Sequence, residues 1–115
     1  MQVQRAARMA LVALALVLVV DSAWRLAVDS CRTLPYADAV DRLQSLTAVH
    51  PVPRYALELQ ADLGWEYVQR EKSLAAVEYV WGLTRGVWLR TGRDRDRARA
   101  AWLAVMLQHP VAESR

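Results

Sequence analysis

The longest uninterrupted apolar stretch lies near the N-terminus, where twelve apolar residues run from Met9 to Val20 between Arg8 and Asp21. A helix of this length rises about 18 Å, whereas the hydrocarbon core of a bilayer is about 30 Å thick. Flanking small and apolar residues can lengthen the span, so the sequence predicts an N-terminal membrane segment over residues 1–28. The predicted anchor residues are Met9, Leu11, Leu14, Leu16, Leu18 and Val20, with Trp24 at the lipid–water interface.

The same outline fits a secretory signal peptide, in which a basic start precedes an apolar core and a cleavage site. Arg5 and Arg8 supply the basic start, and cleavage before Ala23 would release an exported, soluble helical binding module. A third alternative is a short helix buried in a partner protein. The α-amino group adds positive charge before the apolar run, whereas Asp21 and Asp29 follow it. We therefore expect a cytoplasmic N-terminus and a periplasmic body in the inner membrane of a bacterium.

After the apolar run, apolar positions recur every three or four residues, which is the period of amphipathic helices. We predict an all-α fold in which residues 29–110 form a bundle or stack of about four antiparallel helices, with a flexible tail at 111–115. The predicted buried positions are Tyr36, Val40, Leu43 and Leu46 or Thr47 in the first helix; Tyr55, Leu59, Leu63 and Tyr67 in the second; Leu74, Val77, Trp81, Thr84 and Trp88 in the third; and Ala98, Ala101, Trp102, Val105 and Met106 in the fourth.

Hydroxyl residues, glycine and proline mark the boundaries of these helices. Thr33 is the predicted N-cap of the first body helix, and Ser73 is the predicted N-cap of the third. The prolines of segment 51–53 separate the first helix from the second, because each proline disfavours the helical conformation of the residue before it. Thr91–Gly92 ends the third helix, and His109–Pro110 ends the fourth.

Charge is balanced along the body. Arg5 and Arg8, two of the 15 basic residues, precede the apolar run, which leaves the body nearly even against 12 acidic residues. A nucleic-acid-binding domain normally has a basic surplus, so we expect no nucleic-acid partner. The alternating charges of segment 93–99 form a basic patch or, as we favour, a solvated first helical turn in which Asp94 and Asp96 neutralise the arginines.

The sequence contains no recognisable catalytic or metal-binding pattern. Cys31 is the only cysteine, which excludes an intramolecular disulfide, and we expect it to be a small, half-buried helix residue. His50 and His109 each stand alone beside a proline, outside the spacing of metal ligands. One helical face carries three acids that could hold a cation, although a solvated polar face also explains Glu58, Asp62 and Glu66. We therefore expect no enzymatic activity, no cofactor and no metal.

Two segments with similar spacing carry a resemblance to a known family. They read Ala39-x3-Leu43-x2-Leu46-x4-Pro51 and Ala98-x3-Trp102-x2-Val105-x4-Pro110, and between them lie Leu63-Gly64-x2-Tyr67 and then Ala76. This pattern resembles tetratricopeptide repeats, which carry L-G-x2-Y, then A-x3-F, then P. Trp102 stands where that family places phenylalanine. The resemblance implies a stack of helical hairpins that presents surfaces to other proteins.

A neutral, tryptophan-rich helical body behind a membrane segment is typical of a protein that works through protein contacts. Gly82 and Gly86 have small-xxx-small spacing, which fits either core packing or a seam between two copies of the chain. We expect a non-enzymatic accessory, assembly or scaffolding subunit of a cell-envelope complex, such as secretion, pilus or polysaccharide machinery, with protein partners or a second copy. The predicted partner-contact residues are Trp65, Trp81, Gly82, Gly86, Trp88 and Trp102.

Overall fold

A computed structural model describes residues 2–108, and over this range the chain is helical with no strand. One long helix comes first, a short 3₁₀ turn (Cys31–Thr33) follows, and the remaining helices form a bundle. The helices are α1 (Gln2–Ser30), α2 (Tyr36–Val49), α3 (Arg54–Glu71), α4 (Leu74–Thr84), α5 (Val87–Arg90) and α6 (Asp94–Gln108). Four main body helices, with α5 as a single turn, confirm the predicted all-α bundle behind an N-terminal apolar helix.

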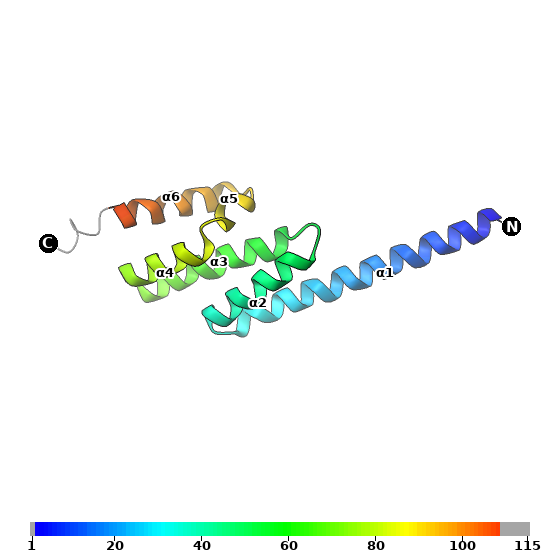
Figure 1. Cartoon of the computed structure of the whole chain (residues 1–115), viewed down its shortest axis with the longest axis horizontal. Helices are drawn as coiled ribbons and strands as arrows, with labels where there is room; N and C mark the ends of the chain where they lie inside the picture. The colour runs from blue at the N-terminus through cyan, green and yellow to red at the C-terminus, as the bar shows by residue number, and fades with distance from the viewer. Residues whose placement is uncertain (1, 109–115) are drawn as a thin grey trace.

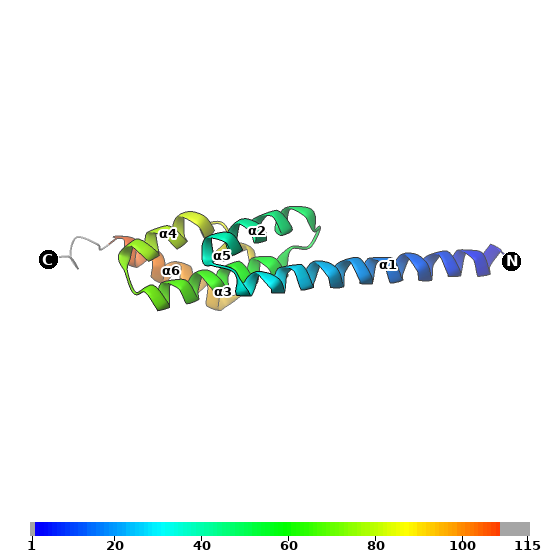
Figure 2. The ribbon, with the colours of Figure 1, turned by 90° about the horizontal axis from the view of Figure 1, so that it is seen from below.

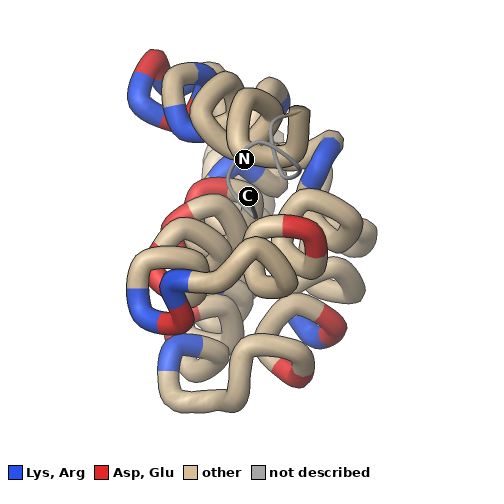
Figure 3. The backbone as a smooth tube through the Cα atoms, turned by 90° about the vertical axis from the view of Figure 1, so that its left-hand side faces the viewer, with Lys and Arg blue, Asp and Glu red and all other residues tan. Residues whose placement is uncertain are grey.

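The N-terminal part of α1 projects from the bundle as a free rod (Figures 1 and 2). We call this rod, residues 2–20, the arm, and residues 21–108 the body. The arm makes the molecule elongated, with extents of 79 × 25 × 17 Å. Seen along the long axis in Figure 3, basic and acidic positions intermingle on the helices of the body.

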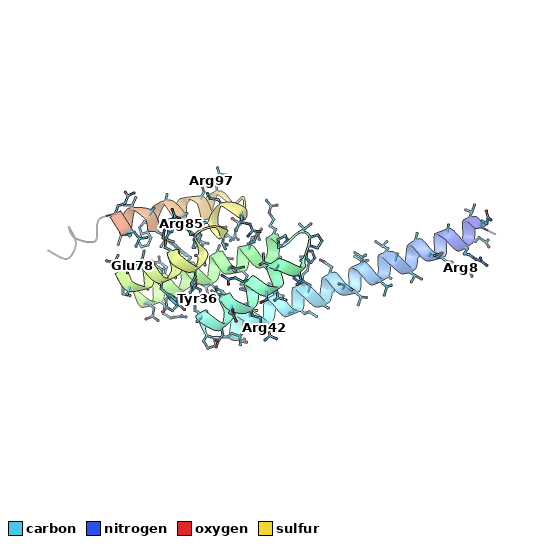
Figure 4. The ribbon with its side chains drawn as sticks, in the orientation of Figure 1. Arg8, Tyr36, Arg42, Glu78, Arg85 and Arg97 are labelled. Atoms are coloured by element: carbon cyan, nitrogen blue, oxygen red, sulfur yellow. The ribbon has the colours of Figure 1, made fainter. Side chains whose placement is uncertain are left out.

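Helix α3 is the centre of the body and packs against α1, α2, α4 and α5. Of its predicted stripe only Leu59 is fully buried, and Tyr55, Leu63 and Tyr67 are partly buried, because neighbouring helices cover other faces of α3 as well. The buried positions of α3 are Ala56, Leu57, Leu59, Gln60, Ala61, Gly64 and Val68. Gly64 is the point of closest approach: a Cβ atom there would lie 3.0 Å from Val80 Cγ1 and 3.1 Å from the Tyr36 hydroxyl oxygen. Figure 4 labels Tyr36 within the body.

The helix boundaries agree with the sequence at some caps and differ at others. Ser73 is the N-cap of α4, and its hydroxyl accepts a hydrogen bond from the Ala76 N–H at 3.1 Å. The prediction for Thr33 is wrong, because its hydroxyl instead donates to the Ser30 carbonyl at 3.1 Å and α2 begins only after Pro35. The predicted helix end at His109–Pro110 and the tail at 111–115 lie outside the described residues.

The predicted third body helix is interrupted after Thr84, where α4 ends and the short α5 follows. Its predicted stripe is nevertheless turned inward, with Val77, Thr84 and Trp88 buried and Leu74 and Trp81 partly buried. Two hydrogen bonds of the Thr84 hydroxyl connect the helices across this break. The hydroxyl donates to the Val80 carbonyl at 2.6 Å and accepts from the Trp88 indole N–H at 3.0 Å. Gly92, with φ of +72°, then ends this region as predicted.

Candidate functional site

The arm presents apolar side chains to solvent on every side. Along residues 2–20 each position is exposed, and nothing in the body covers it. At about 1.5 Å per residue the arm is about 28 Å long, close to the thickness of a bilayer core. By length and composition, segment Gln2–Thr33 is the one candidate membrane span within residues 2–108. The exposed predicted anchor residues are Met9, Leu11, Leu14, Leu16, Leu18 and Val20.

Trp24 is an exception among the predicted anchor residues. It is only 8% exposed and lies in the core of the body, not on the arm. The position is explained by helix geometry, since Trp24, Val28 and Cys31 repeat at four and three residues and together face α2 and α3. The prediction of an interfacial Trp24 is therefore wrong. Cys31 is fully buried rather than half-buried, and desolvation raises the pKa of its thiol.

A polar pair marks the point where the arm meets the body. His50 Nε2 lies 2.9 Å from Asp21 Oδ1, and Arg25 Nε donates to Asp21 Oδ2 at 3.0 Å. His50 Nδ1 accepts a hydrogen bond from the Val52 N–H at 3.0 Å, so in the neutral ring the proton is on Nε2, which then donates to Asp21. The charge of Asp21 is thus satisfied by the body. Asp21 and His50 are 29 residues apart in sequence, so no local sequence pattern predicts that they pair.

The predicted partner-contact tryptophans occupy different environments. Trp88 is fully buried, so the prediction that it contacts a partner is wrong. Its indole ring lies in the hydrophobic core, and the indole N–H donates a hydrogen bond to the Thr84 hydroxyl. Trp65 and Trp81 are partly buried against that core. Trp102 is 41% exposed and meets Trp65 edge to face, with ring centroids 5.3 Å apart. Only Trp102 among these four presents much of its ring to solvent.

Gly82 and Gly86 lie on the surface rather than in a packed seam of the body. A Cβ atom built at either glycine meets no heavy atom within 4 Å. Of the two interpretations of this pair, core packing therefore does not hold in this chain. The surface at Gly82 on α4 and at Gly86 between α4 and α5 is open to solvent.

Helix α6 buries a different face from the one predicted. Ala98, Ala101, Trp102 and Val105 are exposed and Met106 is only partly buried, so the predicted stripe is wrong. The buried positions are Leu103 and Asp96, both with no exposed surface. The physical reason is that the first turn of α6 is fixed by charged hydrogen bonds to α3, and these bonds set the rotation of the helix.

A buried charged cluster fixes this rotation. Asp96 accepts hydrogen bonds from the Thr91 hydroxyl at 2.7 Å, from Arg93 and from Arg99 at 3.1 Å. Arg93 and Arg99 each donate to Asp62 at 2.9 Å, which ties α6 to α3. The first turn is solvated at Asp94, Arg95 and Arg97, as predicted, whereas Asp96 is buried. Of the two acids predicted to neutralise arginines, Asp96 does so through Arg93 and Arg99. Partial burial acts to raise the pKa of Asp62, but the hydrogen bonds from both arginines outweigh it and hold that pKa below its ordinary value.

The three acids predicted to share one face of α3 do not form a ligand set. Glu58 and Asp62 face Arg93, which directly precedes α6, whereas Glu66 is exposed. Within residues 2–108, no group of three or more His, Cys, Asp or Glu side chains is arranged to hold a metal ion. The cluster contains a strongly paired aspartate rather than an acid near neutrality, so it fits a structural role better than proton transfer.

Comparison with known proteins adds no relative. No family model, no curated protein and no solved structure matches this chain. The two segments that carry the resemblance to tetratricopeptide repeats differ in burial, because Ala39 and Leu43 are buried whereas Ala98 and Trp102 are exposed.

Proposed function

We propose that this chain is a single-pass membrane protein whose helical body acts, without catalysis, as an accessory, assembly or scaffolding subunit of a bacterial cell-envelope complex. One observation carries the proposal: the arm exposes an apolar surface all round, yet it is a rigid continuation of a helix packed into the body. Such a surface is unfavourable in water and favourable in lipid. The N-terminus with Arg5 and Arg8 is cytoplasmic and the body is periplasmic in this proposal.

Retention of the arm, rather than its removal as a signal peptide, is supported by the packing around the junction. Cleavage before Ala23 would remove Asp21 and with it the partner of His50. It would also leave Trp24, a core residue, one position from a new chain end. The body therefore has a structural use for residues on the arm side of that cleavage site.

Protein contact is proposed for two exposed surfaces, the apolar surface of α6 and the surface at Gly82 and Gly86. Trp102 and Val105 are 41% and 52% exposed, and Gly82 and Gly86 allow close approach of another helix. Exposed aromatic side chains are typical of interface cores, and small residues let the backbone of another helix approach closely. The partner is another protein of the complex or a second copy of this chain.

The membrane proposal is tested by alkaline carbonate extraction of the full chain expressed in a bacterium. We expect wild-type protein to stay with the membrane pellet until detergent is added. Leu14→Arg should reduce the membrane-bound fraction, because an arginine at the centre of a spanning helix costs about 2.5–3.5 kcal/mol. Leu26→Arg is the matched control, since Leu26 is 69% exposed on the same helix but beyond Asp21, and it should leave the protein in the pellet.

Release of the wild-type protein by carbonate, together with a mature N-terminus at Ala23, would overturn the proposal in favour of an exported module. N-terminal sequencing of the pelleted and released fractions distinguishes these outcomes.

A further inference from the structure

The loop that joins α2 to α3 lies at the end of the body from which the arm projects (Figures 1 and 2). Its residues, 50–53, include two prolines and one valine, and Val49 precedes them at the end of α2. Val49 is 74% exposed and Val52 is 67% exposed. This apolar loop is therefore a second exposed apolar surface on the same side of the body as the arm.

A groove of about 510 Å³ separates the loop from the last turns of the arm. The residues that line it are Leu16, Val17, Leu18, Val20, Asp21, Val49, His50 and Pro51. The loop thus lies level with Leu16–Val20, and the apolar surface of the arm continues across the groove onto Val49 and Pro51.

The position of the loop relative to the arm is fixed by aromatic and polar contacts. The rings of Trp24 and His50 are in contact, with centroids 4.1 Å apart and planes tilted by 33°, and His50 also pairs with Asp21. The Trp24 indole N–H donates to the Leu46 carbonyl at 2.9 Å, which holds the end of α2. These contacts hold the loop against the base of α1, the helix that carries the arm.

We infer that the α2–α3 loop is a second membrane contact, in which Val49 and Val52 enter the lipid at the boundary between acyl chains and headgroups. The inference rests on the proposed membrane span. Leu16 and Val20 are about 6 Å apart along the helix axis, so placing both in lipid brings the loop beside them into the same layer. Within the arm, the uninterrupted apolar run from Met9 to Val20 is only about 18 Å long, shorter than a bilayer core of about 30 Å, and this shortfall draws the body against the membrane.

A lipid surface fits this end of the body better than the helix of a partner protein, because arginines lie next to the apolar loop. A shallow hollow beside the loop is lined by Pro51, Val52, Pro53, Arg54, Leu57 and Arg90. Arg54 and Arg90 are exposed, as is Arg25 near Asp21. An apolar tip flanked by arginines matches acyl chains below phosphate headgroups.

The test measures the depth of single positions with an environment-sensitive fluorophore on an introduced cysteine. The full chain is reconstituted in two sets of vesicles of phosphatidylethanolamine and phosphatidylglycerol, one with a nitroxide on the acyl chain near the headgroup and one with a nitroxide near the bilayer centre. Labels go on Val52→Cys and, independently, Val49→Cys. Leu14→Cys reports the span itself, and Glu71→Cys at the C-terminal end of α3 reports the far end of the body. Wild-type protein, in which Cys31 is buried, gives the background labelling.

We expect blue-shifted emission for labels at 14, 49 and 52, with strong quenching by the central nitroxide at 14 and by the headgroup nitroxide at 49 and 52, and neither change at 71. Quenching at 14 without quenching at 49 and 52 would overturn the inference and leave the membrane span intact, as when a partner helix covers the groove. Absence of quenching at 14 would overturn the span and the inference together. Circular dichroism of each labelled variant verifies that the helical fold is retained.

Discussion

The indole N–H of Trp24 donates a hydrogen bond to the carbonyl oxygen of Leu46 at 2.9 Å, across 22 positions of sequence. This bond joins the helix that carries the arm to the C-terminal half of α2. With Val28 and Cys31 buried on the same side, α1 has two parts with different environments, a free arm and a packed base. The arm is therefore a rigid extension of the body rather than a tether.

The first prediction concerns the packed base of α1. Trp24→Ala removes a buried ring, its hydrogen bond to Leu46 and its contact with the His50 ring, and should lower the free energy of unfolding by about 3–5 kcal/mol. Urea unfolding of the full chain in mild detergent, followed by circular dichroism, measures the change.

Leu26→Ala serves as the control, because Leu26 is 69% exposed on the same helix. It should change the free energy of unfolding by less than about 0.5 kcal/mol. Equal stability of the two variants would mean that the base of α1 does not pack as described.

The second prediction compares two helical glycines. Gly64→Ala would place a Cβ atom 3.0 Å from Val80 Cγ1 and 3.1 Å from the Tyr36 hydroxyl oxygen, and should destabilise the fold by about 1–3 kcal/mol. Gly82→Ala meets no atom within 4 Å and should stabilise α4 by about 0.5–1 kcal/mol. Thermal unfolding in detergent should move the two midpoints in opposite directions; a shift in the same direction contradicts the packing at Gly64.

Local signals were sufficient for most of the fold. Ser73 caps α4 as its position before an apolar run indicated, and the stripes of α2 and α4 follow the period of the sequence. These features depend on residues within one or two helical turns. The anchor residues from Met9 to Val20, which are exposed, were also predicted from a local signal, because an apolar run with no polar face is not the pattern of a helix that packs on a body through one face.

Long-range contacts explain where the sequence predictions were wrong. From Ala100 to Leu107 helix α6 is apolar on nearly every side, so periodicity could not choose its buried face. The buried face is instead set by the hydrogen bonds of Arg93 and Arg99 to Asp62, and Asp62 is more than 30 residues away from both arginines in sequence. In the same way, the burial of Trp24 depends on Leu46 and His50, which no local pattern connects to it.

The third prediction concerns acid stability. The pKa of Asp62 is lower in the folded chain than its ordinary value of about 3.9, so ionised Asp62 stabilises the fold above that pH, and the stabilisation is lost as pH falls through the folded pKa. Asp62→Asn should therefore reduce stability at neutral pH and flatten the fall in stability below about pH 4. Urea unfolding at a series of pH values measures this.

Asp41→Asn is the matched control for the acid series, because Asp41 is exposed on α2. It should keep the pH dependence of the wild-type protein. If Asp62→Asn also keeps that dependence, the arginines of α6 do not stabilise the carboxylate of Asp62 in solution.

The fourth prediction separates the two roles of tryptophan in the body. Trp102→Ala loses an edge-to-face contact with Trp65 and should lower the free energy of unfolding by about 0.5–1.5 kcal/mol, whereas Trp88→Ala leaves a cavity in the core and should lower it by about 3–5 kcal/mol.

The partner surface is probed in cells by a photoreactive residue at Val105, with the same residue at Glu71 as the control. We expect discrete adducts with one partner protein or with a second copy from 105 and none from 71, and Trp102→Ala should weaken the adducts while the body stays folded. Equal adducts with and without Trp102 would keep α6 at the interface but remove Trp102 from it. Absence of adducts from 105 would remove α6 from the interface and leave the open surface at Gly82 and Gly86 as the remaining contact.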